Sequence, residues 1–219
     1  MAFEYVNRQG DKYQVVRGKS RGDKPKYYFA KDTKKRSSGT PVETIPDGFE
    51  VYENPGNGQV FLRRPKPSPI TDEELEALRE IVGKEARRCL VERDGDALVV
   101  YGPDRTEEDA RELMDHISMF DPLAKLLEHS GMSSALVASM KDEVAQRRRD
   151  NIDWYQGQSH YQKVLQFQLV DADKRRFVAE RWHFSFDDWF SLGGGSEKLS
   201  TLARRYVRHI GKESFFELM

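Results

Sequence analysis

The side chains best suited to binding or catalysis near the C-terminus surround a run of three glycines, Gly193–Gly195, that precedes a predicted helix. Ser196 follows the run as the expected N-cap of that helix, and Lys198 comes two residues later. Unpaired backbone N–H groups and the positive end of the helix dipole favour a bound anion at such a helix start. Gly194, Gly195, Ser196 and Lys198 are therefore candidate anion-binding residues. A flexible joint before a capped helix is the alternative explanation of the same pattern.

Arg181 and His183 add a basic and a titratable side chain to the hairpin that is predicted before the glycines. They alternate with Trp182, Phe184 and Phe186, which are in phase on one strand face and are expected to belong to the core. Arg181 and His183 are then expected on the opposite face, from which they could reach a ligand. With the glycine-rich turn they would line the cleft of an enzyme acting on an anionic, phosphorylated substrate. Plain structural packing of the two side chains is the alternative.

A second group of candidate residues is basic and lies near the N-terminus. Between residues 8 and 36 the sequence contains 11 basic and three acidic residues. Residues 1–70 carry a net charge of +6, residues 71–150 one of −8 and residues 151–219 one of +1. This asymmetry indicates either a polyanionic partner, nucleic acid above all, or mutual neutralisation of the first two segments. The candidate nucleic-acid-binding residues are Arg17, Lys19, Arg21, Lys24, Lys26, Lys34, Lys35 and Arg36.

Motifs with a more specific chemistry are absent from the sequence. It has no RNP1-type aromatic run, no KH Gly-x-x-Gly loop, no zinc finger and no Gly-x-Ser-x-Gly nucleophile motif. A single Cys excludes a disulfide scaffold within the chain and the usual structural zinc site. Cys89 lies on the apolar stripe of a predicted helix, where burial keeps the pKa of a thiol high and the thiol inert. The sequence therefore predicts neither a metal nor another cofactor.

Length and apolar runs narrow the class of protein. A chain of 219 residues with 36 basic and 37 acidic residues is long enough for one large or two small domains. Its longest apolar runs fall far short of the ~20 residues that span a membrane. The first ten residues lack the apolar region of a secretory signal. We therefore expect a cytoplasmic protein without membrane contact, whose oligomeric state the sequence does not determine.

The basic residues must be positioned by a strand-rich segment, residues 1–64. Strands are predicted over 3–6, 13–17 and 26–31, and a hairpin joins 49–53 to 59–63 through the turn Asn54-Pro55-Gly56-Asn57-Gly58. The segments 18–25 and 32–41 have no apolar side chain other than proline and are expected to be the least ordered. Prolines at 65, 67 and 69 predict a stiff spacer over residues 65–70.

One stretch of this segment resembles a known family. Ile45-Pro46-Asp47-Gly48-Phe49-Glu50, followed by Gly58-Gln59-Val60-Phe61, is similar to the opening of a WW domain. The resemblance covers about 18 residues and implies a single hairpin. The chain then continues as Arg63-Arg64-Pro65 without the third strand and the closing Trp of that family, so the groove for proline-rich ligands is not expected.

Residues 71–219 are predicted to form a domain of helices and antiparallel hairpins. Thr71 and Glu74 make a capping box at the start of the first helix. Helices are predicted at 71–89, 106–130, 133–148 and 196–210, and hairpins pair 90–92 with 97–101 and 161–170 with 175–186. The fold class is thus α+β, with a strand-rich basic N-terminal part followed by a mixed helix and antiparallel-hairpin domain.

Two classes of function fit these residues, and a third is open. The leading interpretation is a non-enzymatic binding protein whose basic N-terminal part contacts nucleic acid or another polyanion, such as an acidic protein. The alternative is an enzyme acting on an anionic substrate at the glycine-rich turn before the C-terminal helix. A protein–protein adaptor would instead present an exposed apolar patch, expected around Trp154 and Tyr155.

Overall fold

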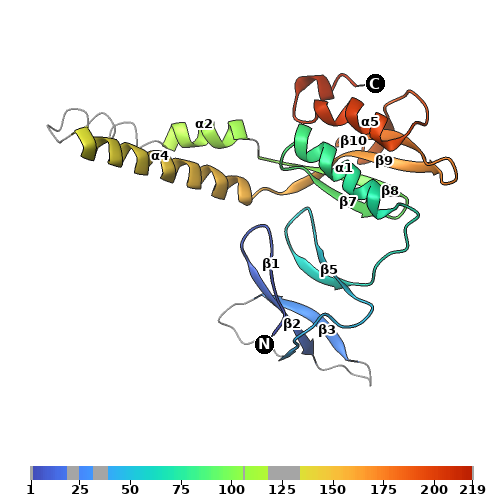
Figure 1. Ribbon diagram of the computed structural model, residues 1–219, viewed down its shortest axis with the longest axis horizontal. Helices are drawn as coiled ribbons and strands as arrows, with labels where there is room; N and C mark the ends of the chain where they lie inside the picture. Colours follow the sequence, from blue (N-terminus) through green and yellow to red (C-terminus); the bar gives the residue numbers. More distant parts are fainter. Residues whose placement is uncertain (1, 19–24, 32–38, 106, 118–133, 219) are drawn as a thin grey trace. The chain divides into compact units, whose positions relative to one another are not determined.

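A computed structural model describes residues 2–18, 25–31, 39–105, 107–117 and 134–218 of the chain (Figure 1). The chain divides into two compact units, Met1–Pro103 with His160–Met219 and, as an insertion between them, Asp104–Ser159. The described residues contain four α-helices and 11 strands, which pair in antiparallel fashion in three sheets. The predicted α+β class is therefore confirmed. The predicted boundary at residues 64–71 lies inside the first unit and stays a prediction.

A five-stranded antiparallel sheet forms the centre of the first unit. Its order is β11-β10-β9-β8-β7, and its strands are β7 (Leu90–Asp94), β8 (Ala97–Pro103), β9 (Tyr161–Asp171), β10 (Arg176–His183) and β11 (Asp188–Ser191). The β7–β8 and β9–β10 hairpins follow the prediction. Gly95 has a φ of 64° in the β7–β8 turn, a conformation that glycine adopts without strain. The β10–β11 hairpin was not predicted.

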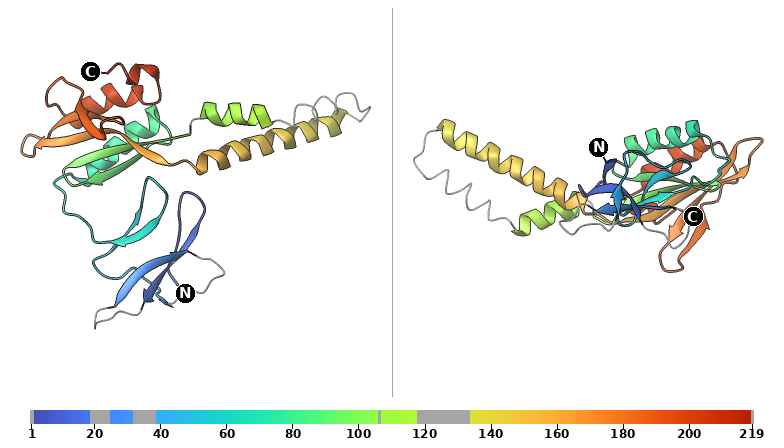
Figure 2. Two further views of the ribbon diagram at one scale, coloured as in Figure 1. Left: turned by 180° about the vertical axis from the view of Figure 1, so that it is seen from behind. Right: turned by 90° about the horizontal axis from the view of Figure 1, so that it is seen from below.

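Helices α1 (Asp72–Glu85) and α5 (Leu199–Tyr206) lie side by side along one face of this sheet, as both views of Figure 2 show. Leu78 and Val82 of α1 and Leu202 of α5 are fully or almost fully buried against sheet residues such as Phe167 and Phe177. Burying one such side chain stabilises the fold by about 1.5–3 kcal/mol. This apolar layer holds the sheet and the helices together.

The ends of these helices confirm the predicted capping box and correct two other predictions, the place of Cys89 and the N-cap of the last helix. The Thr71 hydroxyl accepts a hydrogen bond from the Glu74 N–H and the Glu74 carboxylate accepts one from the Thr71 N–H, which is the predicted capping box. Helix α1 ends at Glu85, so Cys89 lies beyond the helix rather than on its stripe. Helix α5 begins only at Leu199, with Lys198 as its N-cap, so Ser196 does not cap it. Residue 197 is instead held to β10 by a pair of backbone hydrogen bonds with Phe177.

Two smaller sheets form the N-terminal part of the same unit. Strands β1 (Glu4–Val6), β3 (Lys26–Lys31) and the two-residue β4 (Thr40–Pro41) all pair with β2 (Lys12–Gly18). Strands β5 (Glu50–Glu53) and β6 (Val60–Arg63) form the predicted hairpin. The segments expected to be least ordered lie mostly outside the described residues, at 19–24 and 32–38, whereas Thr40 and Pro41 belong to β4.

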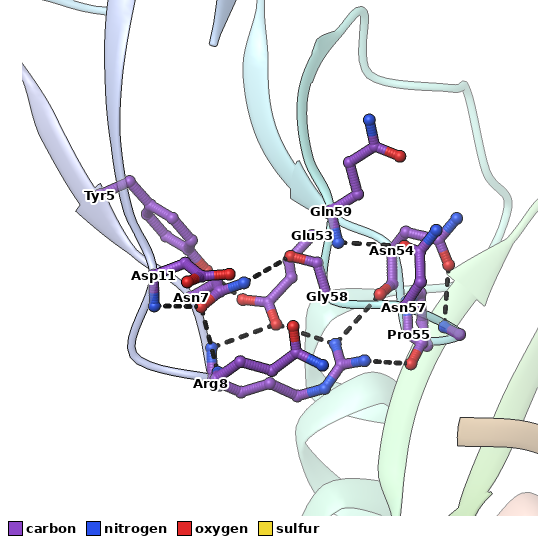
Figure 3. Close-up of polar contacts among 12 residues, drawn as sticks. Tyr5, Asn7, Arg8, Asp11, Glu53, Asn54, Pro55, Asn57, Gly58 and Gln59 are labelled. Carbon is purple, nitrogen blue, oxygen red and sulfur yellow. Dashed lines mark hydrogen bonds and ion pairs between the residues drawn. The ribbon is translucent and has the colours of Figure 1, made fainter. Parts of the chain in front are cut away.

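A polar seam joins the β1–β2 turn to the β5–β6 hairpin (Figure 3). The buried Asn7 side chain donates to the Gly58 carbonyl at 2.7 Å and accepts from the backbone N–H groups of Gln9 and Asp11. The guanidinium of Arg8 donates to the Glu53 carboxylate at 2.8 Å and to the backbone carbonyls of residues 54 and 55. Arg8 also stacks over the Tyr161 ring at 4.9 Å. The seam thereby connects the hairpins to each other and to β9.

The second unit contains α2 (Glu107–Ile117) and α4 (Ser134–Gly157). An ion pair between Arg148 and Asp115 links the two helices. Helix α4 runs nine residues beyond the predicted end at Arg148, because no Gly or Pro interrupts the chain before Gly157. The predicted helix at 106–130 is described only over residues 107–117. Among the described helices, none combines the length and the apolarity needed to cross a bilayer.

Candidate functional site

The structure places Arg181 and His183 on the helix-covered face of the sheet, at the end of β10. Phe177 and Ala179 are buried on that face, and the alternation of the strand continues to Arg181 and His183. Trp182 lies on the other face, in an edge-on contact with Trp189 at 5.0 Å between ring centroids. The prediction that Trp182, Phe184 and Phe186 share one core face is therefore wrong. Strand β10 ends at His183, and the alternation that the prediction assumed ends with it.

Residues 184–187 form the turn of the β10–β11 hairpin and expose their aromatic side chains. Phe184 is 56% and Phe186 67% exposed, and Phe190 on β11 is 44% exposed. Phe216, near the end of the chain, is 71% exposed. We refer to Phe184, Phe186, Phe190 and Phe216 as the aromatic patch. Asp187 has a φ of 50°, the left-handed conformation that lets the chain reverse between these rings.

A hollow of about 240 Å³ opens beside the aromatic patch. Two of the predicted site residues line it, together with aromatic residues of the hairpin and of the C-terminal segment; the lining residues are Arg181, Trp182, His183, Phe184, Ser185, Phe215 and Phe216. One guanidinium nitrogen of Arg181 donates to the backbone carbonyls of Phe215 at 3.0 Å and Phe216 at 2.9 Å. Arg181 thus fastens the C-terminal segment across the end of the sheet.

His183 lies between the hollow and the exposed rings. Its imidazole is 4.7 Å from the Phe186 ring and 5.2 Å from the Phe190 ring, measured between centroids. The Nδ1 atom is buried and has no hydrogen-bond partner among the described residues. An unpaired buried ring nitrogen costs free energy unless a ligand or a water satisfies it. His183 therefore lines the hollow and has one buried ring nitrogen without a hydrogen-bond partner among the described residues.

The glycine-rich turn lies apart from this hollow and is not among its lining residues. Gly193, Gly194 and Gly195 all have positive φ, between 72° and 83°. Beside the turn, the two terminal nitrogens of Arg205 bind the two carboxylate oxygens of Glu197 at 2.6 and 3.1 Å. A side chain at Gly194 would meet this ion pair within 4.0 Å. The structure therefore brings Arg181 and His183 together but does not bring them to Gly194, Gly195, Ser196 and Lys198.

The predicted nucleic-acid-binding residues are described only in part. Arg17 and Lys26 lie near each other at the paired ends of β2 and β3, and both are exposed. Two other cations of the basic run, Arg8 and Lys31, are bound to carboxylates: Lys31 lies 2.6 Å from Asp11. The other six candidates, Lys19, Arg21, Lys24, Lys34, Lys35 and Arg36, lie outside the described residues. Binding of nucleic acid or another polyanion by this part stays a prediction.

The structure also describes three further residues that the sequence singled out: Cys89, Trp154 and Tyr155. Burial raises the pKa of the Cys89 thiol to about 11, as expected of an inert thiol, although the residue precedes β7 instead of lying on α1. Trp154 is exposed, whereas Tyr155 lies half-buried beneath the guanidinium of Arg105 at 4.6 Å. No group of three or more metal-ligating side chains occurs in the described part of the chain.

Sequence reasoning missed the exposure of Phe184, Phe186 and Phe190 and the contribution of Phe216. The adjacent acidic residues Asp187 and Asp188 were an available signal, because two carboxylates between aromatic residues favour a turn over a continuing strand. The pairing of the hairpin with the C-terminal segment is tertiary and had no such signal. Comparison with known proteins adds no relative: no family model, no curated protein and no solved structure matches this chain.

Proposed function

We propose that the protein is a non-enzymatic binding protein that docks a short segment of another protein on the aromatic patch. The observation that carries the proposal is a group of four exposed phenylalanine rings: Phe184 and Phe216 line the hollow, and Phe186 and Phe190 contact His183 at its edge. Exposed apolar side chains scattered singly are ordinary on a protein surface, whereas a contiguous group of them is typical of interaction sites. Large aromatic rings are also enriched at the energetic centres of protein interfaces.

The charges next to the aromatic patch define the chemistry of the segment. Asp187, Asp188 and Glu217 neighbour the patch residues in the chain, are exposed, and form no ion pair with any described residue. Arg181, the cation that lines the hollow, already donates to the carbonyls of the C-terminal segment. A segment with two or more apolar side chains flanked by Lys or Arg matches both the rings and these carboxylates.

The expected affinity is modest. Covering four half-exposed rings removes on the order of 400 Å² of apolar surface from water, which is worth about 10 kcal/mol at about 25 cal/mol per Å². Loss of translational and rotational freedom opposes association by about 4–15 kcal/mol. At the low end of this cost about 6 kcal/mol remains, which corresponds to a dissociation constant of tens of micromolar or weaker.

The test is a selection of random peptides on the whole protein, with counter-selection against a variant in which Phe186, Phe190 and Phe216 are all changed to Ser. We expect the selected peptides to be apolar and basic, and to bind the triple variant at least tenfold more weakly in fluorescence anisotropy. Val170→Ser is the matched control, because Val170 is a comparably exposed apolar residue, at 53%, outside the aromatic patch. The proposal fails if no peptide is enriched. It fails equally if the triple variant binds the selected peptides like the wild type.

A further inference from the structure

A polar cleft lies along β7, one edge strand of the five-stranded sheet. The aromatic patch is at the other edge, beside β11. The volume of the cleft is about 390 Å³, within the range of small-molecule sites. Tyr5 of β1, all four residues of β5, the start of α1 and Glu92 and Arg93 of β7 contribute to its walls. Most of the lining side chains are charged or carry a hydroxyl group, so the cleft is suited to a polar ligand.

The cations of the cleft are already neutralised. The guanidinium of Arg63 binds Glu50 at 2.7 Å, and that of Arg93 binds Asp72 at 2.5 Å. Arg79 and Lys66 bind the carboxylates of Glu76 and Asp94 at 2.7 and 2.9 Å. An anionic ligand would have to displace a carboxylate from each of these cations, so the cleft is poorly suited to anions.

The carboxylates of the cleft are paired in the same way, with one exception. Glu53 accepts hydrogen bonds from Arg8 and, at 3.0 Å, from the Tyr5 hydroxyl, as Figure 3 shows. Glu50 and Asp72 belong to the ion pairs described above. Glu92 alone of the lining carboxylates has no ion-pair or hydrogen-bond partner among the residues that the structure describes.

Glu92 projects from the middle of β7, opposite Val99 of β8, and is half-buried. Burial raises the pKa of its carboxyl, the nearby Glu50 and Glu53 raise it further, and Arg63 and Arg79 lower it. This direction of the pKa agrees with a carboxylate whose lost hydration is only partly compensated by the two guanidinium groups. A further cation beside Glu92 would supply the missing compensation.

We propose that this cleft binds a small organic cation, an ammonium or a guanidinium group, through an ion pair with Glu92. The Tyr5 ring in the same cleft suits such a ligand, because aromatic rings attract ammonium and guanidinium groups. Arg63 does not itself form the ion pair with Glu92, since its guanidinium is bound to Glu50 and lies 3.8 Å over the Tyr52 ring. A metal ion fits poorly, because a single free carboxylate is too small a ligand set.

The experiment titrates the whole protein with agmatine and with n-butylamine, followed by isothermal calorimetry and by amide chemical shifts. Neutral n-butanol and the dianion glutarate serve as ligand controls. We expect weak, salt-sensitive binding of both amines, with the largest shifts at β5 and β7, and no binding of butanol or glutarate. The Glu92→Gln variant should lose at least tenfold in affinity, which corresponds to about 1.4 kcal/mol. Glu92→Asp, which keeps the charge, should lose less.

Glu85→Gln is the matched control, because it removes one exposed carboxylate of α1 that does not line the cleft. Its affinity for the amines should equal that of the wild type. The proposal is overturned if the wild type binds neither amine, or if Glu92→Gln binds them within twofold of the wild type. Tighter binding of glutarate or of Ca²⁺ alone than of the amines would also overturn it. The melting temperature of Glu92→Gln separates loss of the ligand contact from loss of folding.

Discussion

Replacing Arg8 by Ala tests whether this residue serves folding instead of ligand binding. The sequence places Arg8 first in the basic run, where it counts toward a polyanion-binding surface. The structure instead directs its guanidinium into the polar seam, where it donates to Glu53 and to the carbonyls of residues 54 and 55 (Figure 3). The alanine variant would leave the Glu53 carboxylate without its cation and both carbonyls without this donor.

The size of the effect follows from the burial of the pair. The side chains of Arg8 and Glu53 are 17% and 16% exposed, so little water can replace the lost contacts. Removing one partner of a buried ion pair costs about 3–5 kcal/mol, and the stack on Tyr161 adds about 0.5–1 kcal/mol. The residual exposure reduces these costs. We expect the free energy of unfolding to fall by about 3 kcal/mol, a large part of the 5–15 kcal/mol typical of a folded protein.

Urea unfolding measures this loss, and hydrogen exchange locates it. The urea midpoint should fall by about 1 M for a slope of about 2–3 kcal/mol per M. Amide exchange should accelerate first at Asn54 and Gly58, whose N–H groups are bonded inside the β5–β6 turn. Arg17→Ala is the control: this exposed residue of the same run should change stability by less than about 0.5 kcal/mol. If the two variants lose equal stability, the structural role assigned to Arg8 is refuted.

Four further outcomes are expected. Thr71→Ala should lower the free energy of unfolding by about 1 kcal/mol in urea, because it removes the capping box, whereas Thr71→Ser should keep it. The Cys89 thiol, with its pKa raised to about 11 from an ordinary 9.0, should react with iodoacetamide at pH 8 about a hundredfold more slowly in the native than in the unfolded protein. The native state holds the proton of Glu92 more tightly than the unfolded chain, because its pKa is raised, so the ionised carboxylate lowers stability at pH 7. Glu92→Gln should therefore melt at a higher temperature than the wild type at pH 7. Below the ordinary pKa of Glu the two melting temperatures should be equal. If the basic N-terminal part binds RNA or DNA, the logarithm of the binding constant from gel shifts should fall with the logarithm of the salt concentration, with a slope of about −0.7 to −0.9 per phosphate contact. Changing Lys34, Lys35 and Arg36 to Ala should make that slope shallower.

Local patterns predicted most of the elements because their causes are local. The capping box at Thr71 and Glu74, the Asp94-Gly95 turn and the β5–β6 turn each depend on side chains a few residues apart. The errors arose at the ends of elements. Helix α1 stops before Cys89, and β10 stops at His183, because the chain must turn there to pack its next segment.

The candidate sites depend on contacts that no local pattern encodes. Arg181 and Phe216 are 35 residues apart, and Arg8 and Glu53 are 45 apart, yet each pair is joined by a hydrogen bond. Because side chains alternate along a strand, the sequence predicted that Arg181 and Trp182 lie on opposite faces of the sheet. Which of the two faces the helices cover was decided by where α1 and α5 pack.

The sequence by itself determined the α+β class, the order of all elements except β4 and β11, and the separation of charge along the chain, since composition, periodicity and turn chemistry are properties of neighbouring residues. Only the tertiary structure decided which charges are free. It pairs two cations of the basic run with carboxylates, Arg8 with Glu53 and Lys31 with Asp11. It leaves Glu92 without an ion pair among the described residues of its cleft. A charge acquires its energetic role from its partner and its burial, and both arise from segments that are distant in the sequence and adjacent only after folding.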